Sequence, residues 1–332
     1  MSPSSSAPLA EFPPVIGEDL LRRLVPMADA IEASRHGFAA TAKAEVTVPL
    51  RSSLSQDRVL VMPAEHISGS GLIKVISLRS DAWEQGVPSI GGVVLWIDGK
   101  TGKIAALLEA AALTALRTGA ASGLATALLA PQASHVLAML GAGDQAPDQI
   151  AAVCAVRPIA EVRVYSRRYQ RSEDLCRRLR PRHPGITFQP VATAQSAVRG
   201  ADVICTATRS TTPLFEATDL KQQAHINAVG AYRHDMSEVP PEAFGQASVV
   251  VIDQLEAVLA EAGDLVQALA GGHVRQQDLI EIGQLLTGEA EPASGLTIFK
   301  SVGIAAQDWS LCELAVRRAA ETGTFPASVP AP

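Results

Sequence analysis

The order of hydrophobic and polar residues divides the 332-residue chain into two parts with different periodicities. In the first part, residues 17–46 place apolar side chains at helical spacing and predict two helices that break near Pro26. Residues 111–130 show the same helical pattern without interruption until a proline ends it. The segments between these helices are expected to be short strands, at 58–64, 71–78 and 91–109. The last segment carries Asp98-Gly99 and Thr101-Gly102 in its middle and predicts a hairpin.

In the second part, strand-like runs alternate with helical stretches, at 135–140, 161–166, 186–192, 201–207, 225–231 and 247–253. Such alternation is typical of a doubly wound parallel sheet, so the expected fold class is α/β. Residues 298–323 predict one long amphipathic C-terminal helix that returns to pack on the N-terminal part. We therefore expect a flexible arm at 1–14, a nucleotide-binding domain at 125–303, and a second α+β domain at 15–124 completed by 304–332.

Composition narrows the functional classes. A formal net charge of -6 argues against nucleic acid as a partner, because phosphate binding needs concentrated Lys and Arg. Four cysteines without CxxC or Cys/His spacing predict reduced thiols in a cytoplasmic protein and no metal site. The Ser/Pro-rich start lacks the order of a signal peptide, and no stretch is expected to supply the ~20 apolar residues that span a bilayer, so we expect no membrane association.

The strand at 135–140 runs into a GxGxxA motif. Gly141 would supply the tight turn, Gly143 a close backbone approach to a pyrophosphate, and Ala146 a small side chain that lets the following helix lie against the strand. The motif follows a strand and opens a helix, which favours dinucleotide binding over an ordinary turn. We expect Asp144 and Gln145, inside the motif, to belong to the cofactor site as well.

The end of the next strand favours NADPH over NADH. NAD enzymes usually place an acid there to bond the ribose 2′-hydroxyl, whereas this chain has Ser166, Arg167 and Arg168. An arginine fork binds a 2′-phosphate bidentately. The alternative is that these arginines only solvate the end of the strand.

Three cations precede the nucleotide domain in apolar surroundings. Lys74 lies inside the run GLIKVISL, and strand alternation leaves open whether it points to solvent or into a cavity. Arg117 lies among small residues in a predicted helix, where a charge needs a partner. That partner would be the carboxylate of a ligand or an internal acid such as Glu109. Arg51 follows the segment VTVPL.

The motifs LTALRTGAASGLAT, GAGDQA, INAVGAYRHDMSE and TIFKSVGIAAQDW resemble, in order and spacing, the ornithine cyclodeaminase/mu-crystallin family. The resemblance covers nearly the whole chain after the N-terminal arm. It implies a Rossmann-type domain and a substrate domain that forms a homodimer and is completed by the C-terminal helix. It also implies that Arg51, Lys74 and Arg117 surround the α-carboxylate of the substrate.

The loop after the strand at 225–231 distinguishes between activities within that family. Cyclodeaminases carry an aspartate two residues after the loop glycine, where this chain has Tyr232, and Asp235 comes three residues later. The loop resembles that of the bacterial ketimine reductases, which act on Δ1-pyrroline-2-carboxylate and Δ1-piperideine-2-carboxylate. The resemblance implies hydride transfer from NADPH to the C=N carbon, giving L-proline or L-pipecolate. Lys74 and Tyr232 are the candidate proton donors, with water as a rival.

The remaining expected cofactor residues follow the later strands, namely Thr206, Thr208, Val229, Ser301 and Gly303. For the threonines the alternative is an ordinary strand role, and for Ser301 it is a helix N-cap. Glu238 is expected to bond loop backbone or a basic neighbour. Two other functions stay open: a cyclodeaminase or amino-acid dehydrogenase that uses NAD, and a binding protein without turnover that resembles mu-crystallin.

Overall fold

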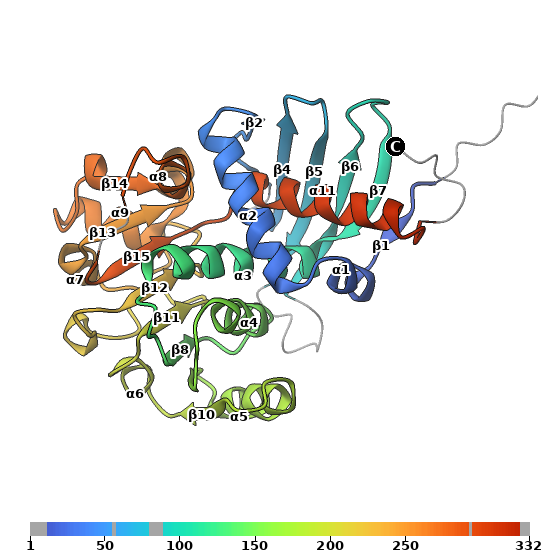
Figure 1. The fold of residues 1–332 in the computed structure, drawn as a ribbon. Helices are drawn as coiled ribbons and strands as arrows, with labels where there is room; N and C mark the ends of the chain where they lie inside the picture. Colours follow the sequence, from blue (N-terminus) through green and yellow to red (C-terminus); the bar gives the residue numbers. More distant parts are fainter. Residues whose placement is uncertain (1–11, 55–57, 80–88, 292–293, 326–332) are drawn as a thin grey trace, which may run out of the picture.

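The computed structural model describes residues 12–54, 58–79, 89–291 and 294–325. Most of the expected N-terminal arm, 1–14, lies outside the described residues. The described chain forms two sheets that lie beside each other, with helices between and around them (Figure 1).

The first sheet is largely an antiparallel meander with the order β1-β7-β6-β5-β4-β2, and β3 pairs with β4. Its strands are β1 Val15–Ile16, β2 Val46–Thr47, β3 Ser52–Leu54, β4 Val59–His66, β5 Gly71–Leu78, β6 Ile90–Ile97 and β7 Ile104–Glu109. The three strand segments expected from the sequence are confirmed. The predicted hairpin joins β6 to β7, where the backbone N–H of Thr101 donates to Asp98 Oδ1 over 2.8 Å.

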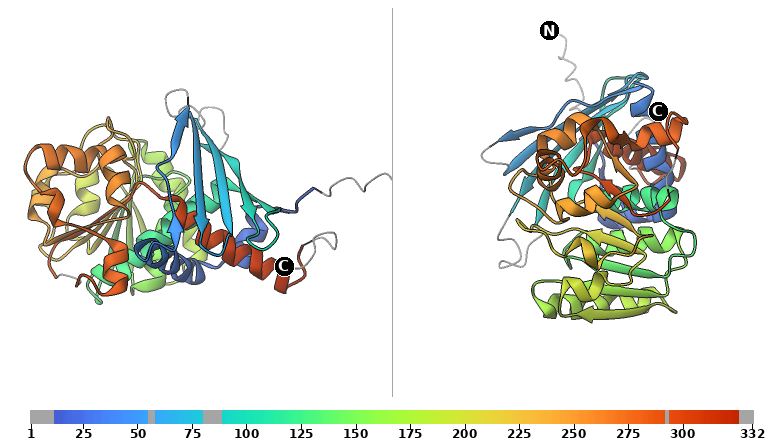
Figure 2. Two further views of the ribbon diagram at one scale, coloured as in Figure 1. Left: turned by 90° about the horizontal axis from the view of Figure 1, so that it is seen from above. Right: turned by 90° about the vertical axis from the view of Figure 1, so that its left-hand side faces the viewer.

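Helices cover one face of this sheet (Figures 1 and 2). They are α1 Glu18–Leu24, α2 Met27–Ala42, α3 Ala110–Leu129 and α11 Ala305–Glu321. The predicted break at Pro26 is confirmed, because it separates α1 from α2. Along β4 to β7, the residues that face the helices are buried and those that alternate with them are mostly half-buried. Lys74 of β5 belongs to the buried set.

The second sheet is parallel and has the order β10-β9-β8-β11-β12-β15-β13-β14, which confirms the expected doubly wound fold class. Its strands are β8 Val136–Leu140, β9 Glu161–Tyr165, β10 Thr187–Val191, β11 Val203–Thr206, β12 His225–Ala228, β13 Val249–Ile252, β14 Leu279–Glu281 and β15 Thr297–Lys300. Its helices are α4 Ala146–Val156, α5 Tyr169–Leu179, α6 Ala194–Val198, α7 Pro241–Gln246, α8 Leu255–Glu261, α9 Gly263–Ala270 and α10 Ile282–Thr287. Single 3-10 turns lie at Arg180–Arg182, Ala217–Asp219 and Gln276–Asp278.

The prediction of one helix over 298–323 is wrong in its first part. Residues 297–300 form β15, which pairs on both sides with β12 and β13 inside the second sheet. The backbone then turns through Gly303, at φ +84°, before α11 begins at Ala305. Apolar residues do recur at helical spacing in this segment. A strand in the middle of a sheet is buried on both faces, however, so the four buried residues of β15 fit the same apolar pattern.

Helix α3 overturns the expectation that no stretch supplies enough apolar residues to span a bilayer. By length and composition Ala110–Leu129 could cross a membrane, yet 89% of its most apolar 18-residue window is buried inside the fold. It contacts α2, α4 and α11 and reaches β6 and β12, so it is the core helix shared by both sheets. The expected domain boundary at residues 124 and 125 falls within this helix, and the division into domains stays an interpretation.

Candidate active site

The glycine loop joins β8 to α4 near the middle of the second sheet. Gly141 has φ +115°, and a Cβ added there would lie 2.5 Å from the carbonyl oxygen of Ala207, so only glycine fits. At Gly143 no atom lies within 4 Å of an added Cβ, which leaves the backbone open to a ligand. Ala146 is buried and begins α4. This confirms the predicted turn and leaves room for a pyrophosphate at the start of a helix.

The other expected cofactor residues lie along the carboxyl edge of the same sheet. Gln145 precedes α4 as its N-cap, and exposed Asp144 accepts a hydrogen bond from Ser89 Oγ over 2.7 Å. The rest lie at or just after the ends of β9, β11, β12 and β15, namely Ser166, Arg167, Arg168, Thr206, Thr208, Val229, Ser301 and Gly303. Parallel strands bind dinucleotides at this edge, so the positions fit the expected cofactor.

Glu238 ties two of these strand ends together. Its buried carboxylate accepts hydrogen bonds from Thr206 Oγ1 and Gly230 N, each over 2.8 Å, and from Thr208 N. Burial raises the pKa of Glu238. The expectation that Glu238 bonds loop backbone is confirmed. The Thr206 hydroxyl already donates to Glu238, so the structure gives this side chain a role within the protein.

Asp253, which the sequence analysis did not single out, holds the turn after β15. One of its carboxylate oxygens, Oδ2, accepts from Ser301 Oγ over 2.8 Å, Val302 N over 2.9 Å and Gly303 N over 2.8 Å. Ser301 is not a helix N-cap, because Ile304 occupies that position in α11. Asp253 directly follows β13, so it fixes this turn to the second sheet, and Gly303 in the turn lies against Arg117.

Lys74, Arg117 and Asp308 form a buried charge cluster. Lys74 Nζ donates to both oxygens of Asp308, over 2.8 and 2.7 Å, and neither side chain is exposed. Arg117 Nε lies 3.5 Å from Asp308 Oδ1. Burial lowers the pKa of Lys74 to about 8 although Asp308 opposes the shift, and burial also lowers the pKa of Arg117. The alternative that Lys74 points to solvent is wrong.

Arg117 is also bonded to Gln307, whose Oε1 accepts from Arg117 Nη1 over 2.9 Å and from Ile304 N over 3.0 Å. Glu109 is not the internal partner of Arg117, because its carboxylate caps α3 by accepting from the N–H groups of Ala111 and Ala112. Within the described residues, two buried donor atoms of this cluster, Arg117 Nε and Gln307 Nε2, have no hydrogen-bond acceptor. A buried donor without an acceptor calls for a partner, and the acceptor atoms of a ligand would supply one.

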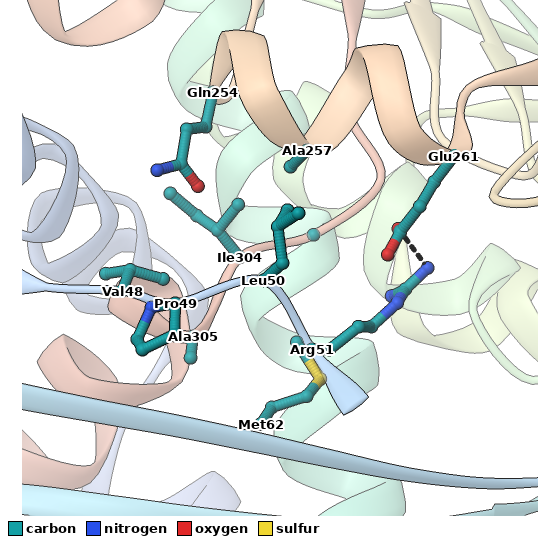
Figure 3. Close-up of a pocket in the computed structure, with 11 residues that line it drawn as sticks. Val48, Pro49, Leu50, Arg51, Met62, Gln254, Ala257, Glu261, Ile304 and Ala305 are labelled. Carbon is teal, nitrogen blue, oxygen red and sulfur yellow. Dashed lines mark ion pairs between the residues drawn. The ribbon is translucent and has the colours of Figure 1, made fainter. Parts of the chain in front are cut away.

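Arg51 lies directly before β3 of the first sheet, and its side chain points toward Glu261 of α8 (Figure 3). It forms an ion pair with Glu261 at the end of α8, and its Nη1 and Nη2 donate to the carbonyl oxygens of Val302 and Tyr232, each over 3.3 Å. The guanidinium lies 5.7 Å from the centre of the Tyr232 ring. Beside it a small pocket is lined by Val48, Pro49, Leu50, Met62, Gln254, Ala257, Gly303, Ile304 and Ala305.

The loop at 230–238 keeps one polar side chain near Arg51 and leaves another at the surface. Tyr232 is half-buried beside Arg51, whereas exposed Asp235 pairs with Arg233 over 2.9 Å. That hydrogen bond lowers the pKa of Asp235, and a carboxylate paired at the surface is poorly placed for catalysis. The structure therefore brings Arg51 and Tyr232 together beside the Lys74 cluster, through Val302 and Gly303, and leaves Asp235 outside.

Four residues of this region escaped the sequence analysis: Asp253, Glu261, Gln307 and Asp308. The signal for the last two was a Gln-Asp pair among apolar residues in GIAAQDW, a segment quoted only for its family resemblance. No group of three or more His, Cys, Asp or Glu side chains in the described part of the chain is placed to hold a metal ion.

Comparison with known proteins places these residues in a family context. The model of the ornithine cyclodeaminase/mu-crystallin family matches residues 18–323. A Delta(1)-pyrroline-2-carboxylate reductase from Bacillus cereus is 35% identical over 319 residues, covering 93% of this chain and 97% of the relative. The ketimine reductase mu-crystallin of Mus musculus is 36% identical over 251 residues, covering 75% of this chain and 76% of the relative.

Solved structures give the same picture. The Delta(1)-pyrroline-2-carboxylate reductase of Thermococcus litoralis, in complex with NADH and L-proline, superposes with a TM-score of 0.89 at 30% identity, covering 94% of this chain and 99% of that one. An archaeal alanine dehydrogenase dimer with bound NAD superposes with a TM-score of 0.86 at 27% identity, covering 95% and 98%.

Proposed function

The chain belongs to the ornithine cyclodeaminase/mu-crystallin family, and on that premise we propose that it is a nicotinamide-dependent reductase of cyclic ketimine acids. The proposed substrates are Δ1-pyrroline-2-carboxylate and Δ1-piperideine-2-carboxylate, which would give L-proline and L-pipecolate. The names of the Bacillus cereus and mouse relatives support this reaction class. The NADH and L-proline held by the Thermococcus litoralis protein support the same pairing of cofactor and product.

The observation that carries the proposal is that two buried cations share one buried carboxylate. Lys74 and Arg117 both lie against Asp308, while Arg51 is paired with Glu261. The cluster of Lys74, Arg117 and Asp308 therefore has an excess of one positive charge away from water. A buried charge needs a counter-charge, and the carboxylate of a small substrate supplies it.

The side chains divide the work of imine reduction. A reduced nicotinamide, when bound at the glycine loop, supplies the hydride. Arg117 and Arg51 hold the carboxylate and so fix the ring of the substrate against the carboxyl edge of the second sheet. Lys74, inside the cluster, donates a proton to the imine nitrogen, because a protonated imine accepts hydride far better. Tyr232 flanks the ring and is the second candidate donor.

The same geometry argues against ring closure with loss of ammonia. That reaction needs an acid close to the amine, at the position that Tyr232 occupies. Asp235 is exposed and paired with Arg233, so it does not supply the missing carboxylate. Tyr232 places a phenol where that reaction needs a carboxylate.

We propose NADPH as the preferred cofactor, with NADH as the alternative. Ser166, Arg167 and Arg168 directly follow β9, and Arg167 and Arg168 are exposed at the edge where the ribose would lie. No acid stands at these positions to repel a 2′-phosphate. The NADH in the Thermococcus litoralis structure belongs to that protein, so the preference of this chain needs its own measurement.

We also propose a soluble, cytoplasmic homodimer that pairs through the uncovered face of the first sheet. On that face β5 and β6 present half-buried Ile73, Val75, Val93 and Leu95, a continuous apolar surface opposite the helix-covered face. Apolar sheet faces of this kind mark interfaces. The archaeal alanine dehydrogenase is a dimer, which supports the proposed dimeric state.

The test is a cofactor-depletion assay with purified protein, both imines, and either NADPH or NADH. We expect oxidation of NADPH by both imines; absence of turnover with NADPH still bound would favour a binding protein. Release of ammonia from ornithine or lysine without net cofactor consumption would favour a cyclodeaminase. Arg117→Ala should raise the imine KM strongly and leave NADPH binding nearly intact.

A further inference from the structure

Asp308 is the central residue of the charge cluster, and the reaction just described gives it no role. It lies in the first turn of α11 and is completely buried. Both of its oxygens accept from Lys74 Nζ, at 2.8 and 2.7 Å, although the two residues lie 234 positions apart in the chain. An interior carboxylate with this geometry determines both the position and the charge of the ammonium that faces it.

We propose that Asp308 is a positioning residue that keeps Lys74 protonated and fixed at the imine nitrogen. The inference rests on the proposed reductase function, because it assigns Asp308 to the proton-transfer step of that reaction. In this step the Lys74 N–H bond breaks, the proton joins the imine nitrogen, and hydride from the reduced nicotinamide adds to the carbon of the C=N bond. The products are the secondary amine, the oxidised nicotinamide and neutral Lys74, which regains its proton from water.

The surroundings of Lys74 explain why it needs this partner. Burial disfavours its ammonium most, and the like charges of Arg117 in α3 and Arg51 beside β3 add to this effect. Cys312, one turn after Asp308 in α11, has a buried thiol whose pKa is raised well above its ordinary value, so it stays neutral. Asp308 is thus the acidic side chain among the charged groups that act on Lys74. Without it, three cations would lie together and Lys74 would lose its proton first.

Burial lowers the pKa of Lys74 to about 8. A general acid is most effective when its pKa lies near the pH at which the enzyme works, so this value suits a proton donor. Because the ammonium form is the donor, kcat should fall as pH rises through about 8 in the wild-type enzyme. Removing the opposite charge in Asp308→Asn should lower the pKa of Lys74 by about one unit or more, so the fall should begin at correspondingly lower pH. At a pH above both values, kcat should be reduced about tenfold or more, since each unit is a factor of ten.

The experiment measures kcat and KM against pH for the wild type, Asp308→Asn and Asp308→Glu. We expect Asp308→Asn to move the alkaline limb of kcat to lower pH without raising the imine KM, because Arg117 and Arg51, the proposed partners of the substrate carboxylate, are unchanged. Asp308→Glu retains the charge and should keep its alkaline limb near that of the wild type. Asp219→Asn is the control, since Asp219 is a buried carboxylate paired with Arg199 at the opposite, amino edge of the second sheet.

A second measurement does not depend on turnover. The chain has six lysines, so 13C-labelled lysine gives few NMR signals, and Lys74→Arg identifies the one from Lys74. We expect this signal to titrate at lower pH in Asp308→Asn than in the wild type. An unchanged titration, or an unshifted kcat limb with a raised KM for both imine and NADPH, would make Asp308 a purely structural partner. If the wild type itself showed no turnover of the imines, that result would count against the proposed function.

Discussion

Arg51 and Glu261 form an ion pair that joins the segment before β3 to the end of α8, with their side chains 11% and 18% exposed. The guanidinium proposed to hold the substrate carboxylate is therefore held by a carboxylate of the protein (Figure 3). A partly buried pair of this kind is worth about 1 kcal/mol, or about fivefold in an equilibrium constant. The substrate has to compete with Glu261 for the same donors.

Glu261→Gln should consequently lower the imine KM about fivefold and leave the KM for NADPH unchanged. Initial rates at several imine concentrations measure this. Glu256→Gln is the matched control, because Glu256 is an exposed acid on the same helix. An increased KM in Glu261→Gln would mean that Glu261 orients Arg51 for the substrate and does not compete with it.

Gly303 lies directly against Arg117. A Cβ added to Gly303 would lie 2.1 Å from Arg117 Nη1 and 2.7 Å from Cζ, and the residue has φ +84°. Gly303→Ala should displace the guanidinium and raise the imine KM about tenfold or more, besides the backbone strain of about 1–2 kcal/mol. Steady-state kinetics and thermal unfolding together measure both effects.

Gly200→Ala is the control that adds backbone strain without a new side-chain contact. Gly200 has φ +75°, but nothing lies within 4 Å of its added Cβ. It should therefore lose stability without changing the imine KM. Equal changes of KM in the two variants would show that Arg117 is unaffected and that strain alone explains the kinetics.

Much of the fold follows from the sequence because local patterns determine it. The βα alternation, the hairpin at Asp98 and the break at Pro26 all depend on residues that are neighbours in the chain. The strands β14 and β15 did not follow from the sequence. β15 ends in Lys300, which is fully buried because Asp264 and the carbonyl oxygen of Ala231 bind its ammonium. Such tertiary partners have no local signature.

The residues of the candidate site could likewise be predicted only in part. Arg51, Lys74 and Arg117 stood out as cations in apolar segments, and the structure brings them into one region. Their acidic partners did not stand out, because Asp308 lies 234 residues from Lys74 and Glu261 lies 210 residues from Arg51. A single sequence contains no signal for such distant pairs, which is why Glu109, the nearest acid along the chain, was the wrong partner for Arg117.

Arg167 tests the preference for NADPH. It is exposed directly after β9, where a 2′-phosphate would meet a guanidinium. Arg167→Ala should raise the KM for NADPH about tenfold and leave that for NADH unchanged, because a charge-assisted hydrogen bond to phosphate is worth about 1.5–3 kcal/mol. The measurement is kcat/KM for both cofactors with one imine. Arg178→Ala, exposed near the end of α5, should change neither. An equal loss with both cofactors would assign Arg167 to the shared part of the dinucleotide.

Val75 tests the proposed dimer. It lies in the middle of β5, opposite Val93 of β6, on the face of the first sheet that the helices leave uncovered (Figure 2). Burying a carboxylate there without a partner is costly, so Val75→Glu should convert a dimer into a monomer at micromolar concentration. Light scattering after size-exclusion chromatography measures the mass. Tyr169→Glu adds the same charge to an exposed residue of α5 and should leave the dimer intact. A wild-type monomer, or a dimer that survives Val75→Glu, would exclude this face as the interface.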